Sequence, residues 1–253
     1  PAAYNDGDET GVMFMQDGTL LTTFQYISNA MDNFIGSEDD NRSLPTFVLI
    51  AVEVAGVGTI RGTLMGNPCT ESGDGERAIE YYSVSGKYAG FISDEVLPFV
   101  TNHEDVKSKY PNLKITDDPA GRAGWGFSAG GATAFNMAFF RPDLFGISIG
   151  YNMALSEGPT LIMKEAKKPI RVFHSSSDHD YGTPNPCAGM PGFLPPYNTG
   201  GGPSIVETNN KIATALTVMG YDTRYAYGLN AVHIANSVIL QDTPNTLVWA
   251  WDA

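Results

Sequence analysis

Residues Gly124–Gly131, with the sequence GWGFSAGG, decide the fold of this chain. They contain the pattern G-x-S-x-G, centred on Ser128. Residues 122–123 are typical of the end of a buried strand, and the apolar residues 132–140 predict a buried helix. A strand-to-helix turn that is sharp enough to expose a serine needs very small residues two positions before and after it. The stretch therefore predicts a nucleophile elbow that presents Ser128 for catalysis. The alternative is a glycine-rich turn with an incidental serine.

The rest of the chain alternates apolar strands with helices. Strands are expected at 11–15, 44–52, 144–151, 169–174 and 223–227, and helices at 77–100, at 206–219 and from Thr243 onward. Continuous apolar runs such as 44–52 are typical of parallel strands that are buried on both faces. The rhythm predicts an α/β protein with a mainly parallel central sheet, in which residues 1–253 form a single catalytic domain. Functional residues in such sheets gather at the carboxyl ends of the strands.

Charge and composition restrict the partners. The chain has 28 acidic residues against 15 basic ones, a formal net charge of −13, which disfavours binding to nucleic acid or to anionic membranes. No apolar run approaches the roughly 20 residues of a membrane-spanning helix, and no signal peptide is visible. We expect a soluble protein, secreted or cytoplasmic, that acts on a small molecule. The oligomeric state is not indicated.

The two cysteines, Cys69 and Cys187, lie in loops that are rich in proline and glycine. Neither has the paired spacing of a zinc site. In a secreted protein they could form a disulfide between the loops, and two free thiols are the alternative.

A serine nucleophile needs a base to accept its proton. Of the four histidines, His233 follows the last expected strand, where the histidine lies in triads ordered serine, acid, histidine along the chain. The alternative is a partly buried histidine that closes a loop. The acid should follow the preceding strand, where Asp178 and Asp180 are both candidates. We prefer Asp178, which is nearer to the expected strand end, because Asp180 precedes a Tyr-Gly pair that is typical of a turn.

An oxyanion hole needs two donors near the nucleophile. Ala129 directly follows Ser128, and its N–H at the start of the expected helix supplies the first. The second is expected in the loop after the first strand, where Gly18 would let the N–H of Thr19 point inward.

Asp17 and Trp125 lie beside these loops and are candidates for contact with substrate. Packing beneath the turn is the alternative for Trp125, and capping of the loop is the alternative for Asp17. The chemistry that these residues suggest requires neither a metal nor an organic cofactor.

With these residues in place, the chain resembles the putative-esterase family of α/β hydrolases, which includes enterochelin and feruloyl esterases, the esterase D group and the mycolyltransferases. The matching segments cover nearly the whole chain: 14–18, 76–81, 94–98, 121–122 with 126–131, 141–145 and 168–173. The resemblance implies an α/β-hydrolase fold. Family members have one or two strands before the segment that begins here at Pro1, so N-terminal edge strands of the sheet could be lacking.

The resemblance also implies roles for individual residues. Ser128 corresponds to the nucleophile, His233 to the base, Asp178 to the acid, and Thr19 and Ala129 to the oxyanion donors. The expected function is hydrolysis of a small carboxylic ester through an acyl-enzyme intermediate. The alternatives are an acyltransferase with the same triad and a non-catalytic binding protein on a hydrolase fold.

Overall fold

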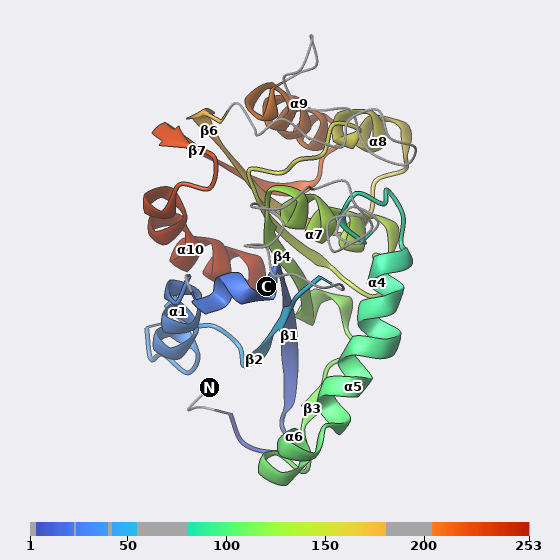
Figure 1. Cartoon of the computed structure of the whole chain (residues 1–253), viewed down its shortest axis with the longest axis vertical. Helices are drawn as coiled ribbons and strands as arrows, with labels where there is room; N and C mark the ends of the chain where they lie inside the picture. Colours follow the sequence, from blue (N-terminus) through green and yellow to red (C-terminus); the bar gives the residue numbers. More distant parts are fainter. Residues whose placement is uncertain (1–3, 23, 40–41, 55–79, 181–203, 253) are drawn as a thin grey trace, which may run out of the picture.

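The predicted apolar strands assemble into one parallel sheet. A computed structural model describes residues 4–22, 24–39, 42–54, 80–180 and 204–252. Within these residues the strands run in the order β2–β1–β4–β5–β6–β7, every pairing is parallel, and β3 pairs with the start of β1 (Figure 1). The strands are β1 (Glu9–Gln16), β2 (Phe47–Val52), β3 (Lys114–Ile115), β4 (Arg122–Phe127), β5 (Ile147–Tyr151), β6 (Arg171–His179) and β7 (Asp222–Val232). The prediction of an α/β fold with a mainly parallel sheet is confirmed.

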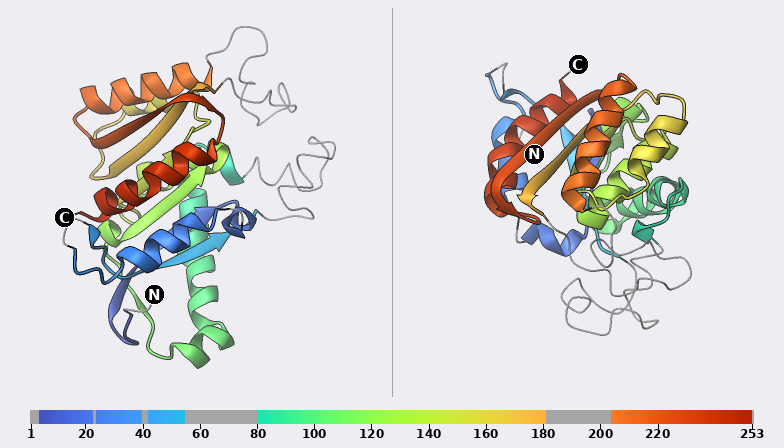
Figure 2. Two further views of the ribbon diagram at one scale, coloured as in Figure 1. Left: turned by 90° about the vertical axis from the view of Figure 1, so that its left-hand side faces the viewer. Right: turned by 90° about the horizontal axis from the view of Figure 1, so that it is seen from above.

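Helices cover both faces of this sheet (Figure 2). The apolar residues of α1 and α10 pack on one face, and those of α4, α5, α7, α8 and α9 pack on the other. The helices are α1 (Tyr26–Phe34), α4 (Lys87–Phe91), α5 (Leu97–Asn102), α6 (Glu104–Lys109), α7 (Ser128–Phe140), α8 (Gly158–Lys164), α9 (Ile205–Val218) and α10 (Asn236–Trp251). A π-helical turn, Ile92–Val96, joins α4 to α5. None of the helices in the described part of the chain is both long and apolar enough to cross a membrane.

The strand β1 shows why its sequence is apolar at nearly every position. Val12 and Phe14 belong to the hydrophobic cluster on the α7 side, whereas Met13 and Met15 belong to the cluster on the α10 side. Successive side chains of a strand point to opposite faces. Because helices cover both faces, both sets of side chains must be apolar.

The strands β6 and β7 are longer than predicted, and this changes the candidate site. The sequence predicts a loop from Ser175, but β6 continues to His179, and β7 continues five residues beyond the predicted end at 227. The two strands pair from Arg171 opposite Asp222 to His179 opposite Val232, with an irregularity after Ser177. Serine and glycine carry no strand signal of their own, so pairing between the strands, not local preference, sets these lengths.

The C-terminal helix also begins earlier than predicted. The sequence predicts a start at Thr243, but α10 begins at Asn236 and contains Pro244. The Thr243 hydroxyl donates to the Ile239 carbonyl at 2.7 Å, within the helix. Buried Ile239 and Leu247 lie on either side of the proline and pack into the same hydrophobic cluster. This packing outweighs the backbone hydrogen bond that Pro244 cannot make.

The predicted pairing of Cys69 with Cys187 lies outside the described residues. It therefore stays a prediction.

The buried histidine of β6 makes the fold sensitive to acid. His174 is fully buried and stacks on Tyr225 of β7, with ring centroids 4.5 Å apart. Burial lowers the pKa of His174 to about 4, whereas an unfolded histidine titrates near ~6.5. Between these two values the unfolded chain binds a proton that the folded chain does not bind, so stability must fall as the pH decreases.

Replacing His174 with phenylalanine should therefore remove part of this acid sensitivity. We compare the melting temperature of the variant with that of wild type at each pH. The difference, variant minus wild type, should increase by roughly 5 °C as the pH falls from about 6.5 to 4. Above this range the difference should be constant. Thermal unfolding followed by circular dichroism measures both curves, with His103→Gln at a half-exposed position as the control. A difference that does not change with pH would contradict the assignment.

Candidate active site

Ser128 lies at the sharp turn between β4 and α7. Its φ of 51° is in the left-handed region, which non-glycine residues rarely adopt. A Cβ atom at Gly126 would lie 2.4 Å from the carbonyl carbon of Gly130, and one at Gly130 would lie 2.9 Å from Cβ of Gln16. Both positions therefore require glycine. Ser128 itself is partly exposed. The turn has the strained strand–turn–helix geometry of a nucleophile elbow.

The carboxylate of Asp180, rather than that of Asp178, lies against the His233 imidazole. Asp180 Oδ1 is 2.8 Å from His233 Nδ1. The Asp180 side chain is completely buried, and 21% of the His233 side chain is exposed. The preference for Asp178 as the partner of His233 is therefore wrong. With Nδ1 engaged by a carboxylate, Nε2 is the ring nitrogen that can accept a proton.

The extension of β6 explains this shift of two residues. Asp178 is still inside the strand, and its carboxylate accepts the backbone N–H groups of Asn230 at 2.8 Å and Ala231 at 3.0 Å. These hydrogen bonds hold the pKa of Asp178 below its usual range. Asp180 follows the strand, and its N–H donates to the Ser177 carbonyl at 3.0 Å in a turn. In the sequence, a predicted turn at Asp180 was the reason to prefer Asp178. In the structure, Asp180 does lie in a turn, and its carboxylate faces the imidazole.

The two expected oxyanion donors differ in their surroundings. Ala129 is in the first turn of α7, where backbone N–H groups have no acceptor within the helix. Thr19 follows β1, and its N–H donates to Glu53 Oε2 at 2.7 Å. Glu53 directly follows β2, the neighbour of β1. The expected second donor is thus engaged by a carboxylate of this chain.

The side chains of Asp17 and Trp125 are both buried. Trp125 is fully buried and packs edge-on against Phe127, with ring centroids 4.4 Å apart. Asp17 is 2% exposed, has a φ of 56°, and donates its N–H to the Tyr81 hydroxyl at 2.8 Å. Its carboxylate lies beside Gly130, where a Cβ atom would be 3.2 Å from Oδ2. Trp125 thus packs beneath the elbow, and Asp17 lies between the elbow and the loop that holds Thr19. Contact of either residue with substrate stays a prediction.

Two residues near the site belong to no sequence motif. Asn152 follows β5, and its side-chain amide donates to Asp180 Oδ2 at 2.5 Å. Glu53 follows β2 and accepts the Thr19 N–H. Both positions directly follow an apolar run that predicts a strand. This place at the carboxyl edge of the sheet is the signal that could have found them.

Neighbouring strands bring these residues to one edge of the sheet. Ser128, Asn152 and His233 directly follow β4, β5 and β7, and Asp180 directly follows β6. Among the described residues, Ser128 and His233 make no hydrogen bond with each other. Catalytic hydrogen bonds are often long before substrate binds. Within the same part of the chain, no group of three or more His, Cys, Asp or Glu side chains could hold a metal ion.

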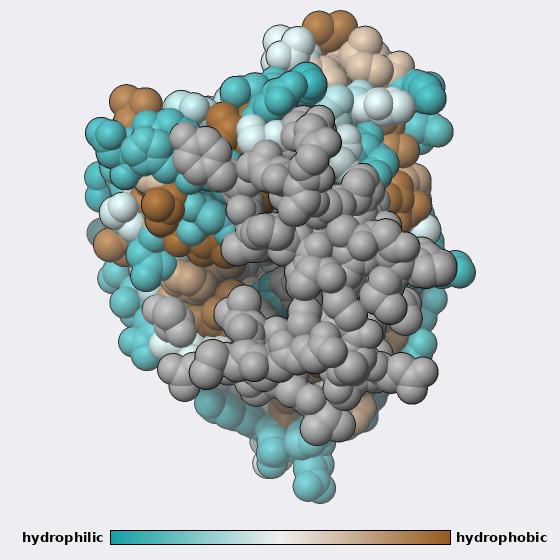
Figure 3. Space-filling view, turned by 45° about the horizontal axis from the view of Figure 1, so that its top comes forward, coloured by the Kyte–Doolittle hydropathy of each residue, from teal (hydrophilic) through white to brown (hydrophobic). Residues whose placement is uncertain are grey.

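The face of the molecule that Figure 3 brings forward has exposed hydrophobic side chains on the side of α10 and β7. The large exposed hydrophobic residues of these two elements include Leu229, Val232 and Leu240, which are 75%, 60% and 54% exposed. Val232 directly precedes His233. Exposed apolar side chains therefore lie next to His233 on this side.

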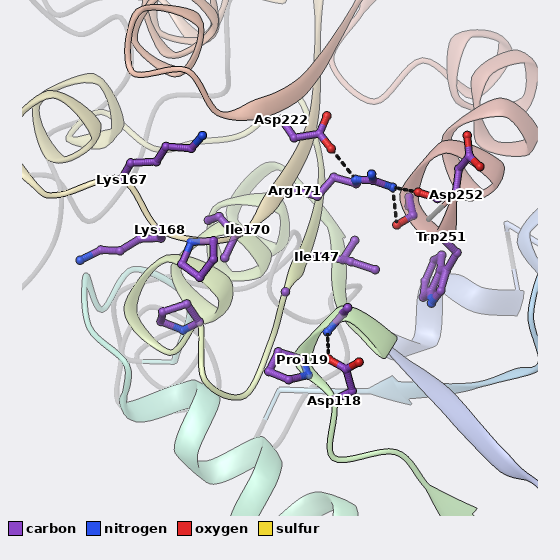
Figure 4. A pocket seen from close by; sticks show the side chains of 15 residues that line it. Asp118, Pro119, Ile147, Lys167, Lys168, Ile170, Arg171, Asp222, Trp251 and Asp252 are labelled. Carbon is purple, nitrogen blue, oxygen red and sulfur yellow. Dashed lines mark hydrogen bonds and ion pairs between the residues drawn. The ribbon is translucent and has the colours of Figure 1, made fainter.

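A pocket at the opposite edge of the sheet has a different character. Its volume is about 560 Å³, and it is lined by residues next to the amino ends of β5, β6 and β7 and by the end of α10 (Figure 4). Arg171 donates to Asp222 at 2.7 Å, to the Trp249 carbonyl at 2.7 Å, and to the Asp252 carbonyl. The guanidinium is thus engaged in tying α10 to the sheet. None of the predicted catalytic residues lines this pocket.

This architecture is that of the α/β hydrolases, and solved structures share it. They include the enterobactin esterase FES from Shigella flexneri (TM-score 0.59, 12% identity, covering 96% of this chain and 53% of that chain). A ferulic acid esterase has a TM-score of 0.60 and 14% identity, with coverage of 97% and 88%. Siderophore hydrolase EstA from Aspergillus nidulans has a TM-score of 0.54 and 14% identity, with coverage of 98% and 84%. The chain spans about half the length of the enterobactin esterase.

The family follows from the sequence. The family model described as Putative esterase matches residues 1–156, which is more than half of the chain. The chain therefore belongs to this family, and the resemblance seen in its motifs is confirmed. Comparison with curated proteins gives no match.

Proposed function

We propose that this protein is a serine carboxylic-ester hydrolase with a catalytic triad of Ser128, His233 and Asp180. The observation that carries the proposal is the buried Asp180–His233 pair, which lies at the same sheet edge as the strained elbow of Ser128. Membership in the Putative esterase family supports ester hydrolysis as the reaction. The fold alone would not decide it, because hydrolase folds host several functions.

The reaction would proceed in two halves. Ser128 Oγ attacks the ester carbonyl carbon while His233 Nε2 accepts the hydroxyl proton, and Asp180 fixes the tautomer and stabilises the imidazolium. The imidazolium then gives this proton to the leaving alkoxide as the ester C–O bond breaks, which leaves an acyl-Ser128 ester. In the second half His233 deprotonates water, the hydroxide attacks the acyl carbon, and the acid is released as Ser128 recovers its proton.

The oxyanion of each tetrahedral intermediate would accept hydrogen bonds from the N–H groups of Ala129 and Thr19. In the structure Thr19 donates to Glu53. The substrate oxygen must therefore displace the Glu53 carboxylate before Thr19 can take part. A carboxylate is a stronger acceptor than an ester carbonyl, so this exchange costs part of the binding free energy.

Replacing Glu53 with alanine should raise kcat/KM for a small activated ester by about tenfold, because Thr19 no longer has to give up a charged acceptor. Initial rates of p-nitrophenyl acetate hydrolysis measure the effect. Glu104→Ala on α6, which removes the same charge at an exposed position, is the control. A tenfold loss in Glu53→Ala with a normal rate in the control would show that Glu53 supports the loop.

A fluorophosphonate probe tests the proposed function directly, because it labels activated serines. We expect labelling at Ser128 in the wild type and none in His233→Ala. Failure to label folded wild-type protein would favour the non-catalytic alternative.

A panel of acetyl, butyryl, feruloyl, sugar and catecholate esters would then define the substrate. The last of these is included because an enterobactin esterase shares the fold. If an added acceptor alcohol takes most of the acyl group in place of water, the protein is an acyltransferase.

A further inference from the structure

The short segment after β5 contacts both the proposed acid and the nucleophile elbow. Asn152, its first residue, is 2% exposed and has a φ of 49°. Its backbone N–H donates to the Ser175 carbonyl of β6 at 3.1 Å. Two residues later, the N–H of Ala154 donates to the Ser128 carbonyl at 3.0 Å. Main-chain hydrogen bonds of the segment therefore join β6, which precedes Asp180, to Ser128.

The side chain of Asn152 acts on Asp180 itself. Its Nδ2 donates to Asp180 Oδ2 at 2.5 Å and to Ser177 Oγ at 3.3 Å. Asp180 Oδ1 is the oxygen that faces His233. A buried carboxylate oxygen without a donor would be costly, and Asn152 supplies that donor. With both oxygens engaged, the carboxylate cannot rotate away from the imidazole.

The backbone narrows the residue types that suit this position. Glycine, asparagine and aspartate are the residues that tolerate a left-handed φ best. Glycine has no side-chain donor, and an ionised aspartate would repel Asp180. Lysine or arginine could donate, but a positive charge there would compete with the imidazolium for the carboxylate. Asparagine combines the backbone conformation with a compact, neutral donor.

We propose that Asn152 is a positioning residue of the triad, which orients the Asp180 carboxylate toward His233 while leaving its charge intact. The inference rests on the proposed function, because it assigns Asn152 a role in the same reaction. It adds a fourth residue, directly after β5, to those that follow the strand ends and build the site.

Asn152→Asp provides the sharpest kinetic test. Aspartate has the same size and tolerates the same backbone. When protonated it can donate to Asp180 as the amide does, and when ionised it places two like charges at hydrogen-bond distance. We expect the ratio of variant to wild-type kcat to fall at least about tenfold as the pH rises from about 5 to 8. A ratio that does not change with pH would show that Asn152 only fills space.

Asn152→Gly keeps the left-handed backbone and removes the donor. We expect kcat to fall by about 10- to 100-fold, with KM for p-nitrophenyl acetate changed less than about twofold. Asn230 provides a control with the same backbone conformation, because its φ is 53°. In the described part of the chain, no hydrogen bond joins the side-chain amide of Asn230 to the proposed triad. Asn230→Gly and Asn230→Asp should leave kcat, and its pH dependence, close to those of wild type.

A spectroscopic measurement separates this inference from the proposed function. The proton between Asp180 and His233 Nδ1 should give a far-downfield proton NMR signal, which needs no turnover. We expect the signal to move upfield or exchange away in Asn152→Gly and to persist in Asn230→Gly. If it does so while wild type neither turns over nor reacts with a fluorophosphonate, the proposed function fails and the positioning role stands. If wild type is active but Asn152→Gly retains both the signal and its kcat, the positioning role is overturned.

Discussion

Replacing Ser128 with alanine should lower kcat by about 10⁴- to 10⁶-fold, because the variant lacks the oxygen that attacks the ester. The residual rate would come from binding and from the oxyanion donors. The fold should persist, since alanine adopts the left-handed φ of 51° about as well as serine does. Circular dichroism of the purified variant checks this point.

The control for this variant is Ser156→Ala, which removes a hydroxyl that bonds the neighbouring Glu157 at 2.8 Å, outside the site. Its kcat should match that of wild type on the same activated ester. Turnover by Ser128→Ala within about tenfold of wild type, in a preparation free of other esterases, would rule out the serine mechanism.

Asp180→Asn should lower kcat by about 10³- to 10⁴-fold, because an amide does not hold the imidazole in the correct tautomer or stabilise the imidazolium. The same two residues that the sequence offers as acids provide the matched pair for this measurement. Asp178→Asn should cost less than about tenfold, since the Asp178 carboxylate bonds backbone N–H groups of β7 and not the imidazole. The reverse ranking would reinstate Asp178 as the acid.

The Asp178→Asn variant should also have a pH-dependent effect on stability. The hydrogen bonds to Asn230 and Ala231 lower the pKa of Asp178, so their contribution to folding is present above the usual carboxyl pKa and is lost as the pH falls through the folded value. Asp178→Asn should therefore lower the melting temperature at neutral pH and approach the wild-type value under acidic conditions.

The parts of the fold with strong local patterns could be predicted from the sequence. The elbow at Ser128 and the buried helix after it follow from glycine spacing and from a continuous apolar run. The ends of β6 and β7 could not be predicted, because Ser175–Ser177 are polar and stay in the strand only through pairing with β7. The start of α10 was missed because Pro244 is a typical first-turn residue, whereas packing of Ile239 extends the helix before it.

The same distinction applies to the candidate site. The positions of His233 and Ala129 could be predicted, because His233 follows the last strand and Ala129 follows Ser128. Their catalytic roles stay predictions. The choice between Asp178 and Asp180 depended on the length of β6, a property of non-local pairing. Asn152 and Glu53 act through single contacts with residues from other strands, and no spacing in the sequence encodes such contacts.

The ties at both ends of α10 have a consequence for inactivation by heat. Arg171, at the start of β6, holds carbonyls at the end of α10, and Asp180, just past the end of β6, holds His233, three residues before α10 begins. Strand, imidazole and helix thus form a closed ring of contacts. His233 cannot leave Asp180 through a rigid shift of α10 alone, because the far end of the helix is anchored to the same strand. If His233 and Asp180 act as proposed, activity should be lost only when this ring melts cooperatively, so the onset of thermal inactivation should coincide with loss of tertiary structure.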